Sequence, residues 1–168
     1  MIMSFLPTFK VLEMNNLTGL RNGHMLSNMK AKVEKIATKT VGENKFLENG
    51  LILGLDADGT VSNYDPASHK MPFVHYTEEL LTLVNELQYY AEPIVDGVVY
   101  PRCVALYVGD TFTTNNYTGT IENNGDGYAT VDAGVLKLQT GAEGAMFKAT
   151  ASSLPNGELA YEFLYLGV

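Results

Sequence analysis

The chain has 168 residues, of which 46% are hydrophobic and 18% charged, and it contains 16 Gly, 10 Tyr and 7 Phe. This length is enough for one domain with a sizeable core, and the aromatic and glycine content favours strands and turns. The net charge of −8 excludes the usual nucleic-acid binders, because the 11 Lys and Arg residues are scattered and form no basic run. The single cysteine, Cys103, excludes an internal disulfide.

We predict an N-terminal arm over residues 1–29, followed by one β-rich domain over residues 30–168. The arm carries large apolar side chains without a helical or strand period, and turn signals interrupt it at residues 15–16 and 21–23. These side chains must be buried on the chain's own domain or on a neighbouring molecule. Both options stay open at this point.

The first residues, MIMSFLPTF, lack the basic leader of a signal peptide and are interrupted by Pro7. No apolar stretch is as long as a membrane span requires. We therefore expect synthesis in the cytoplasm and no membrane partner.

Residues 51–64, LILGLDADGTVSNY, predict a β hairpin, because Asp58-Gly59 is a strong turn signal between two strand-like runs. The same Asp-x-Asp-Gly-Thr resembles the nucleophile motif of haloacid-dehalogenase-type phosphatases. That family builds its site on a parallel α/β sheet, whereas here a segment with two prolines and no helix start follows the motif. A phosphatase that uses Asp56 and Asp58 is therefore kept only as a remote alternative.

Closely spaced carboxylates also suit calcium. An EF-hand loop starting at Asp56 would need a bidentate Glu where Ala67 stands, and no exiting helix follows. Turn chemistry explains these residues without an ion, so we predict no metal site and no cofactor. A looser calcium site shared with Asp126 or Asp132 stays open as an alternative.

One amphipathic helix is predicted at about residues 77–91. Thr77 can cap its N-terminus, Glu78-Glu79 lies in the first turn where the helix dipole favours acidic groups, and Pro93 ends it. The residues that form its apolar face recur at helical spacing: Leu80, Leu83, Val84 and Leu87.

After Pro93 the chain alternates between short strand-like runs and turn signals such as Asp96-Gly97 and Pro155-Asn156-Gly157. The predicted fold class is therefore mainly β (α+β), a small antiparallel barrel or sandwich with one amphipathic helix and an extended N-terminal arm.

The sequence offers little for catalysis. His24, His69 and His75 belong to no recognisable Ser or Cys motif. The apolar neighbours of Cys103 indicate a buried thiol. We predict no catalytic residues, and a chain that is not an enzyme and whose role is to bind another protein.

Several short motifs occur in a characteristic order: Asn16-Leu17, Glu48-Asn49-Gly50, Glu78-Glu79, Arg102, Gly109-Asp110-Thr111-Phe112, Phe147-Lys148-Ala149 and the closing LAYEFLYLGV. In this order the chain resembles the capsid-associated structural proteins of tailed bacteriophages, which decorate or cement the phage head. The resemblance implies a non-enzymatic protein of the virion that binds the major capsid protein as a decoration, cement or minor head protein.

We expect Phe5, Phe9 and Leu12 to be the partner-binding residues, because large apolar groups contribute about 1.5 to 3 kcal/mol each when a partner buries them. A second copy of the chain is a further expected partner, bound through the arm. The alternative is a tail-associated or carbohydrate-binding β module, in which loop tyrosines stack on sugars. Exposed tyrosines grouped at one end of the fold would favour it, and tyrosines buried in strands would not.

Overall fold

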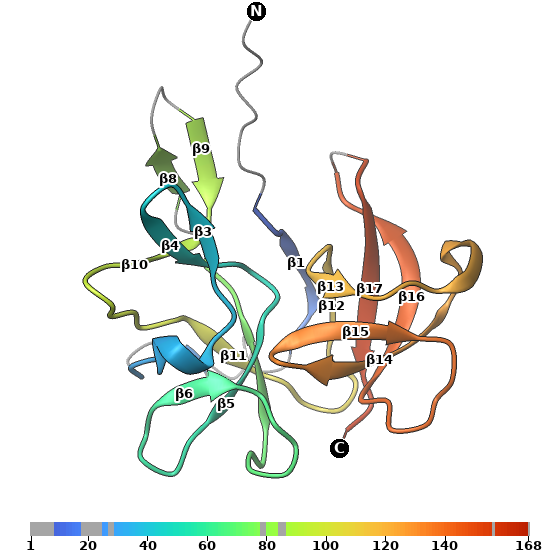
Figure 1. Ribbon diagram of the computed structural model, residues 1–168. Coiled ribbons are helices and arrows are strands. Elements are labelled where there is room, and N and C mark those ends of the chain that lie inside the picture. The colour runs from blue at the N-terminus through green and yellow to red at the C-terminus, as the bar shows by residue number, and fades with distance from the viewer. Residues whose placement is uncertain are drawn as a thin grey trace, which may run out of the picture.

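The computed structural model describes residues 9–17, 25–26, 29–77, 80–83, 87–155 and 157–167. Strands make up 47% of the chain and helical residues 5%, which confirms the prediction of a mainly β fold. Figure 1 shows two lobes side by side, one built on a seven-stranded sheet and the other on three smaller sheets. In the part of the chain that the structure describes, no helix is long and apolar enough to span a bilayer.

The largest sheet has the strand order β1-β12-β17-β16-β14-β15-β13. Its strands are β1 (Leu12–Asn16), β12 (Thr111–Thr114), β13 (Tyr117–Thr118), β14 (Gly127–Asp132), β15 (Val135–Gln139), β16 (Phe147–Ser153) and β17 (Leu159–Tyr165). Most neighbours are antiparallel, and β13 pairs with β15 in parallel. The β14–β15 hairpin turns through Ala133-Gly134, where both residues have the positive φ that a tight two-residue hairpin loop requires.

The other lobe contains a five-stranded sheet with the order β2-β11-β7-β5-β6. Its strands are β2 (Met25–Leu26), β5 (Ile52–Leu55), β6 (Val61–Asn63), β7 (Pro72–His75) and β11 (Cys103–Ala105). The antiparallel pairing of β5 with β6 confirms the hairpin predicted over residues 51–64.

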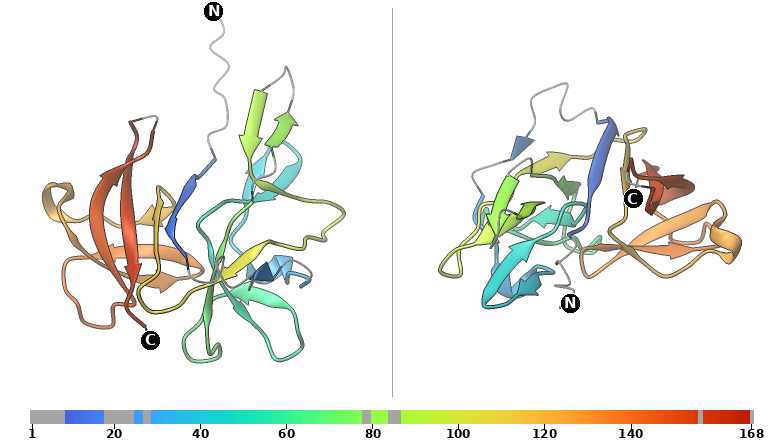
Figure 2. Two further views of the ribbon diagram at one scale, coloured as in Figure 1. Left: turned by 180° about the vertical axis from the view of Figure 1, so that it is seen from behind. Right: turned by 90° about the horizontal axis from the view of Figure 1, so that it is seen from above.

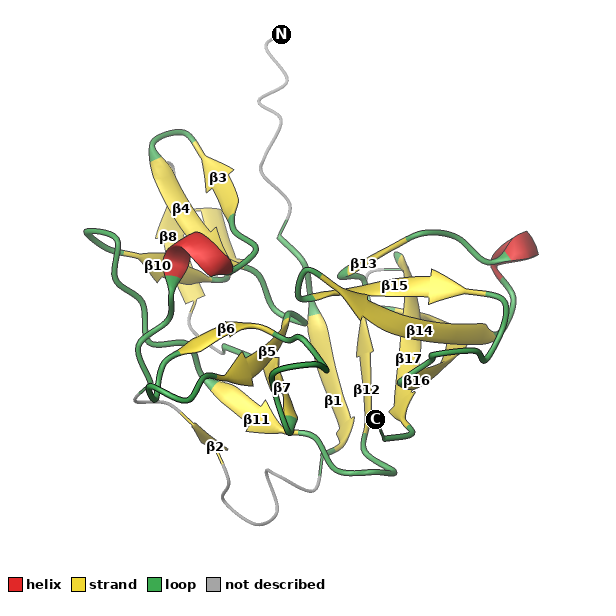
Figure 3. Cartoon of the chain, turned by 60° about the horizontal axis from the view of Figure 1, so that its bottom comes forward, coloured by secondary structure: helices red, strands yellow, loops and turns green. Residues whose placement is uncertain are grey.

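Two small sheets and two helical turns are the remaining elements of the described residues, as Figure 3 shows. They are β3 (Lys39–Val41), β4 (Asn44–Leu47) and β10 (Glu92–Ile94) in one sheet, β8 (Leu80–Leu83) and β9 (Leu87–Tyr90) in the other, and the 3-10 turns η1 (Val33–Lys35) and η2 (Glu122–Asn124).

The helix predicted over residues 77–91 is wrong, because its described residues form the antiparallel hairpin β8–β9. The leucine spacing fits a helix, but the Tyr89-Tyr90 pair favours a strand. Ala91 is fully buried, and the chain must then be extended at Glu92 to pair with β4. Helix propensity is weak, so these tertiary contacts override it. Glu78-Glu79 lies outside the described residues.

The five-stranded sheet is covered on both faces because successive strand residues point in opposite directions. One set of residues enters a core shared with the seven-stranded sheet: Ile52, Val74 and Val104. The alternate set enters a second core formed with η1 and β4: Leu53, Phe73, Cys103 and Ala105.

The described part of the predicted arm is built into this body. Strand β1 lies between the two lobes in both views of Figure 2 and forms one edge of the seven-stranded sheet through its pairing with β12.

Candidate functional site

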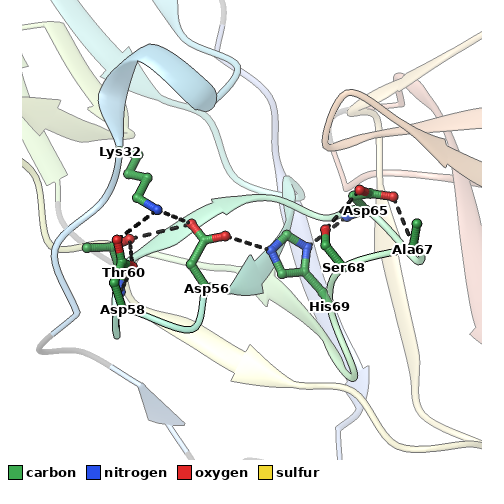
Figure 4. Close-up of polar contacts among 8 residues, drawn as sticks. All are labelled: Lys32, Asp56, Asp58, Thr60, Asp65, Ala67, Ser68 and His69. Carbon is green, nitrogen blue, oxygen red and sulfur yellow. Dashed lines mark hydrogen bonds and ion pairs between the residues drawn. The ribbon is translucent and has the colours of Figure 1, made fainter.

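The Asp-rich turn lies at the tip of the β5–β6 hairpin, where it forms a polar network (Figure 4). The Asp56 backbone N–H donates to the Thr60 carbonyl at 2.8 Å, which closes the turn. The Asp58 carboxylate accepts hydrogen bonds from the Thr60 N–H at 3.1 Å and the Thr60 hydroxyl at 2.6 Å. The turn is therefore held by its own side chains, as Asx turns are.

Lys32 joins this turn from a distant part of the sequence. The Lys32 N–H donates to the Val61 carbonyl at 2.9 Å, which places the residue beside β6. Its ammonium then lies 2.9 Å from a carboxylate oxygen of Asp56 and 2.9 Å from one of Asp58. A protein cation thus lies between two carboxylates that could otherwise share a metal ion.

The charges in this network stabilise one another. Burial alone would raise the pKa of Asp56, but hydrogen bonds from three side chains, Lys32 first, outweigh it and leave that pKa below its usual value. The Thr60 hydroxyl and then Lys32 lower the pKa of Asp58. In return, Asp56 and Asp58 raise the pKa of Lys32. All three groups stay ionised at neutral pH.

His69 connects the turn to the following loop. Its Nδ1 must accept a hydrogen bond, because the backbone N–H of Asp65, 2.9 Å away, can only donate. Its Nε2–H therefore donates to Asp56 Oδ1 at 3.2 Å. Both ring nitrogens are used, and the ring is 6% exposed, so His69 has no lone pair to offer as a general base.

Gly54 makes room for this histidine. A Cβ atom at position 54 would lie 2.2 Å from the His69 ring atoms Cγ and Nδ1. The loop that carries His69 is further fixed by the Asp65 carboxylate, which accepts hydrogen bonds from the Ala67 N–H and the Ser68 hydroxyl. The network thus joins two loops rigidly.

The phosphatase alternative requires surroundings that Asp56 does not have. The strand before Asp56 continues into an antiparallel hairpin, and the helical elements among the described residues are two 3-10 turns. The calcium alternative meets a similar difficulty, since no three His, Cys, Asp or Glu residues in the described ranges are arranged to hold a metal. Asp126 accepts a hydrogen bond from Ala151, and Asp132 pairs with Lys137.

His75 and Cys103 lie opposite each other on β7 and β11. His75 is fully buried, and its Nδ1–H donates to the Arg102 carbonyl at 2.9 Å while Nε2 has no partner within the described part of the chain. Burial lowers the pKa of His75 to about 4. Burial also raises the pKa of the Cys103 thiol, which is 1% exposed as the sequence predicted. Neither group can reach a substrate in this conformation. His24 lies outside the described residues.

Two of the three predicted anchors lie in the chain's own interior. Phe9 is 5% exposed and packs edge-to-face on Phe46, with ring centroids 5.2 Å apart. Leu12 is 5% exposed and belongs to the core shared by the two large sheets. At these positions the arm is buried on its own domain, which was one of the two options. Phe5 lies outside the described residues, and its role as an anchor stays a prediction.

The tyrosines do not form the platform that the carbohydrate-binding alternative requires. Tyr64, Tyr161 and Tyr165 are buried, and burial raises the pKa of Tyr165 to about 12. Among the described tyrosines whose side chains are placed, only Tyr100 is largely exposed, at 50%.

An apolar pocket beside the Asp56 network is the feature that sequence reasoning missed. It has a volume of about 480 Å³ and is lined by Leu55, Ala57, Ser68, Lys70, Met71 and Phe73. Its walls come from Leu55 at the end of β5, from Phe73 in β7, and from the two loops that the Asp56–His69 hydrogen bond joins. The sequence does show apolar residues directly beside the Asp56 turn and the His69 loop. They indicate a pocket only once the structure shows that these two loops meet.

No protein-family model, curated protein or solved structure matches the chain in the three comparisons that were made.

Proposed function

We propose that this chain is a non-enzymatic structural protein of a phage virion, which binds the major capsid protein as a decoration, cement or minor head protein. One observation carries the proposal: among the described residues, the fold itself pairs or buries the candidate chemical groups. Lys32 pairs with both carboxylates of the Asp-rich turn, both nitrogens of His69 are bonded, and Cys103 is buried. What such a body offers a partner is its surface.

Exposed apolar side chains support this proposal. Val108 is 71% exposed and Leu166 is 44% exposed. They are near each other at the C-terminal end of β17, because the Gly109 N–H donates to the Tyr165 carbonyl and the Val108 side chain lies within van der Waals reach of position 167. These two side chains give a protein partner apolar surface to bury. Modest contacts suffice on a capsid, since many copies repeat them over a lattice.

Co-sedimentation of the purified chain with empty capsids of its own phage, across a salt series, tests the proposal. We expect saturable binding that survives high salt, because apolar contacts are not screened by ions. The double variant Val108→Ser/Leu166→Ser should weaken binding by about tenfold or more. Leu159→Ser is the matched control, since Leu159 is 43% exposed at the opposite end of β17. Absence of binding at every salt concentration would reject the capsid role in favour of a tail-associated module.

The anchor prediction needs a separate variant. A chain without residues 1–8 loses Phe5 but keeps Phe9 and β1. If Phe5 is an anchor, this shortened chain should sediment with capsids less than the full chain does. Equal binding of the two chains would remove Phe5 from the interface.

A further inference from the structure

A polar cavity lies where the N-terminal arm enters the seven-stranded sheet. Leu12 pairs with Thr114, which pairs on its other side with Tyr161. The start of β1, the end of β12 and the start of β17 therefore lie side by side at one end of the sheet, the upper end in Figure 1. The cavity at this end has a volume of about 320 Å³. Its lining residues come from all three segments: Phe9, Lys10, Asn115, Tyr117, Glu158 and Leu159.

Three reactive groups meet in this cavity. Lys10 Nζ donates a hydrogen bond to the backbone carbonyl of Asn115 at 2.9 Å. The Asn115 carboxamide oxygen accepts a hydrogen bond from the Val11 N–H at 2.8 Å. The carboxamide nitrogen Nδ2 donates to Glu158 Oε2 at 3.0 Å. An amine, a carboxamide and a carboxylate are thus brought together from segments that are distant in the sequence.

The contacts of the Asn115 side chain suit attack by an amine on its carboxamide carbon. A hydrogen bond from a backbone N–H to the oxygen stabilises the negative charge that develops there during the attack. A carboxylate beside the nitrogen can transfer the proton that this nitrogen needs in order to leave. Lys10 Nζ already lies beside Asn115, and rotation about the flexible lysine side chain brings it to the carboxamide carbon.

We propose that Lys10 and Asn115 join through an amide bond that forms within the chain. The Lys10 ammonium first releases one proton to solvent. The amine nitrogen then bonds to Asn115 Cγ. Both nitrogens are now attached to one carbon, so the Glu158 carboxylate takes a proton from the attacking nitrogen and gives one to Nδ2. The Cγ–Nδ2 bond breaks, and the products are the new amide and one molecule of ammonia, with nothing oxidised or reduced.

The surroundings hold the nucleophile in place. The Lys10 backbone N–H donates to Glu48 Oε1 at 3.0 Å, and Phe9 beside it is 5% exposed and packs on Phe46. The bond would tie the arm covalently to the loop after β12 and close a long loop of chain, which restricts the unfolded state. Each chain reacts once and with itself, so the proposal makes the protein no enzyme and does not depend on its capsid role.

Intact mass spectrometry of the purified full chain tests this proposal. We expect the main species to be lighter than the sequence mass by one ammonia molecule. The new amide also removes the tryptic cleavage site after Lys10, so residues 1–21 and 103–137 should appear together in one branched peptide. Fragment spectra of that peptide should locate the bond at Lys10 and Asn115.

Three variants isolate the groups involved. Lys10→Arg keeps the positive charge but cannot form the bond, so it should retain its full sequence mass. Glu158→Gln keeps an acceptor for Asn115 Nδ2 but cannot transfer the proton, and it should slow the reaction by about a hundredfold or more. Lys137→Arg is the matched control, because Lys137 pairs with Asp132 away from the cavity. Circular dichroism checks that each variant folds.

Two mass results would overturn the proposal. One is a native chain that keeps its full sequence mass after prolonged storage. The other is a loss of ammonia that persists in Lys10→Arg, because it would then come from a succinimide at an Asn-Gly pair such as Asn124-Gly125. Equal reaction rates in the native and Glu158→Gln chains would overturn the role of Glu158.

Discussion

His75 belongs to no sequence motif, yet its burial affects how the stability of the protein depends on pH. Its ring is fully buried, and one nitrogen has no partner within the described part of the chain. A proton added to that nitrogen would place a charge in the core, which burial disfavours. In the unfolded chain the same ring takes up a proton near the usual value of 6.5, whereas in the folded chain it does so only near 4. Between these values the unfolded state binds more protons, so stability must fall as the pH is lowered.

We predict that His75→Gln removes much of this pH dependence. The glutamine amide can still donate a hydrogen bond towards the Arg102 carbonyl but does not titrate. Between about pH 7 and pH 5 the native chain should lose roughly 2 kcal/mol of stability through this group, and the variant should lose correspondingly less. Urea unfolding of both chains at the two pH values measures the difference. The carboxylates of Asp56 and Asp58 interfere little, because their pKa values lie below the usual range and are passed only at lower pH. Equal losses in the two chains would mean that His75 is protonated in the folded state.

Gly54→Ala tests the packing of His69. A Cβ atom at this position would overlap the imidazole, so either the ring or β5 must move and the hydrogen bond to Asp56 must lengthen. We expect a loss of about 1 to 3 kcal/mol in the free energy of unfolding, as for other overpacked sites. Gly141→Ala is the control, since a Cβ there meets nothing within 4 Å. Thermal or urea denaturation compares the two variants, and equal stabilities would show that the site is not tightly packed.

Among the secondary-structure elements, β1 changes the role expected of the N-terminal segment. The two residues that precede β1 hydrogen-bond to a distant part of the chain. The Val11 N–H donates to Asn115 Oδ1 at 2.8 Å, and Lys10 Nζ donates to the Asn115 carbonyl at 2.9 Å. With Leu12 and Leu17 buried, the segment stabilises its own domain, which was one of the two options that the sequence left open.

Two truncations test this role. Removal of residues 1–8, which keeps Phe9 and β1, is the control. Removal of residues 1–17 should abolish cooperative unfolding or lower stability severely, because it exposes one edge of β12 and removes three buried apolar side chains of about 2 to 5 kcal/mol each. Urea unfolding followed by near-ultraviolet circular dichroism measures the loss of stability. The signal reports mainly on the tyrosines, because the chain has 10 Tyr and no Trp. A stable chain without residues 1–17 would mean that β1 is dispensable.

The β8–β9 hairpin shows where element prediction fails. Leucines at helical spacing and a potential capping threonine favoured a helix. Those signals act over three or four residues. Strand β10 directly follows the hairpin and pairs with β4, and this pairing joins residues nearly fifty positions apart in the sequence. The hairpin at residues 51–64 was predictable because the Asp-Gly signal and the pairing it directs lie within the same short stretch.

For the whole molecule, the two lobes share one core. Ile52 and Val74 of the five-stranded sheet pack in the same cluster as Phe112, Phe147 and Phe163 of the seven-stranded sheet. The three phenylalanine rings have centroid separations of 5.8 to 6.3 Å, which suits favourable aromatic packing. Neither lobe can therefore expose its inner face without disrupting the other.

We predict a single cooperative unfolding transition. Scanning calorimetry should give one endotherm whose calorimetric and van't Hoff enthalpies agree. Val74→Ala, which leaves a cavity between the two sheets, should lower the midpoint of that one transition and should not split it. Two separate transitions, one for each lobe, would show that the shared core contributes little.

The sequence by itself determined the features that depend on neighbouring residues: the β-rich character, the turn at Asp58-Gly59 and the burial of Cys103 among apolar neighbours. Only the tertiary structure decided that β1 completes a sheet, that Lys32 lies between Asp56 and Asp58, and that two loops enclose an apolar pocket. The physical reason is the distance along the sequence over which each kind of interaction acts. Turn chemistry and periodicity act over a few residues, whereas Lys32 and Asp56 are 24 residues apart, and Lys10 and Asn115 are 105 residues apart. Such groups meet only when strand pairing and core burial bring their elements together.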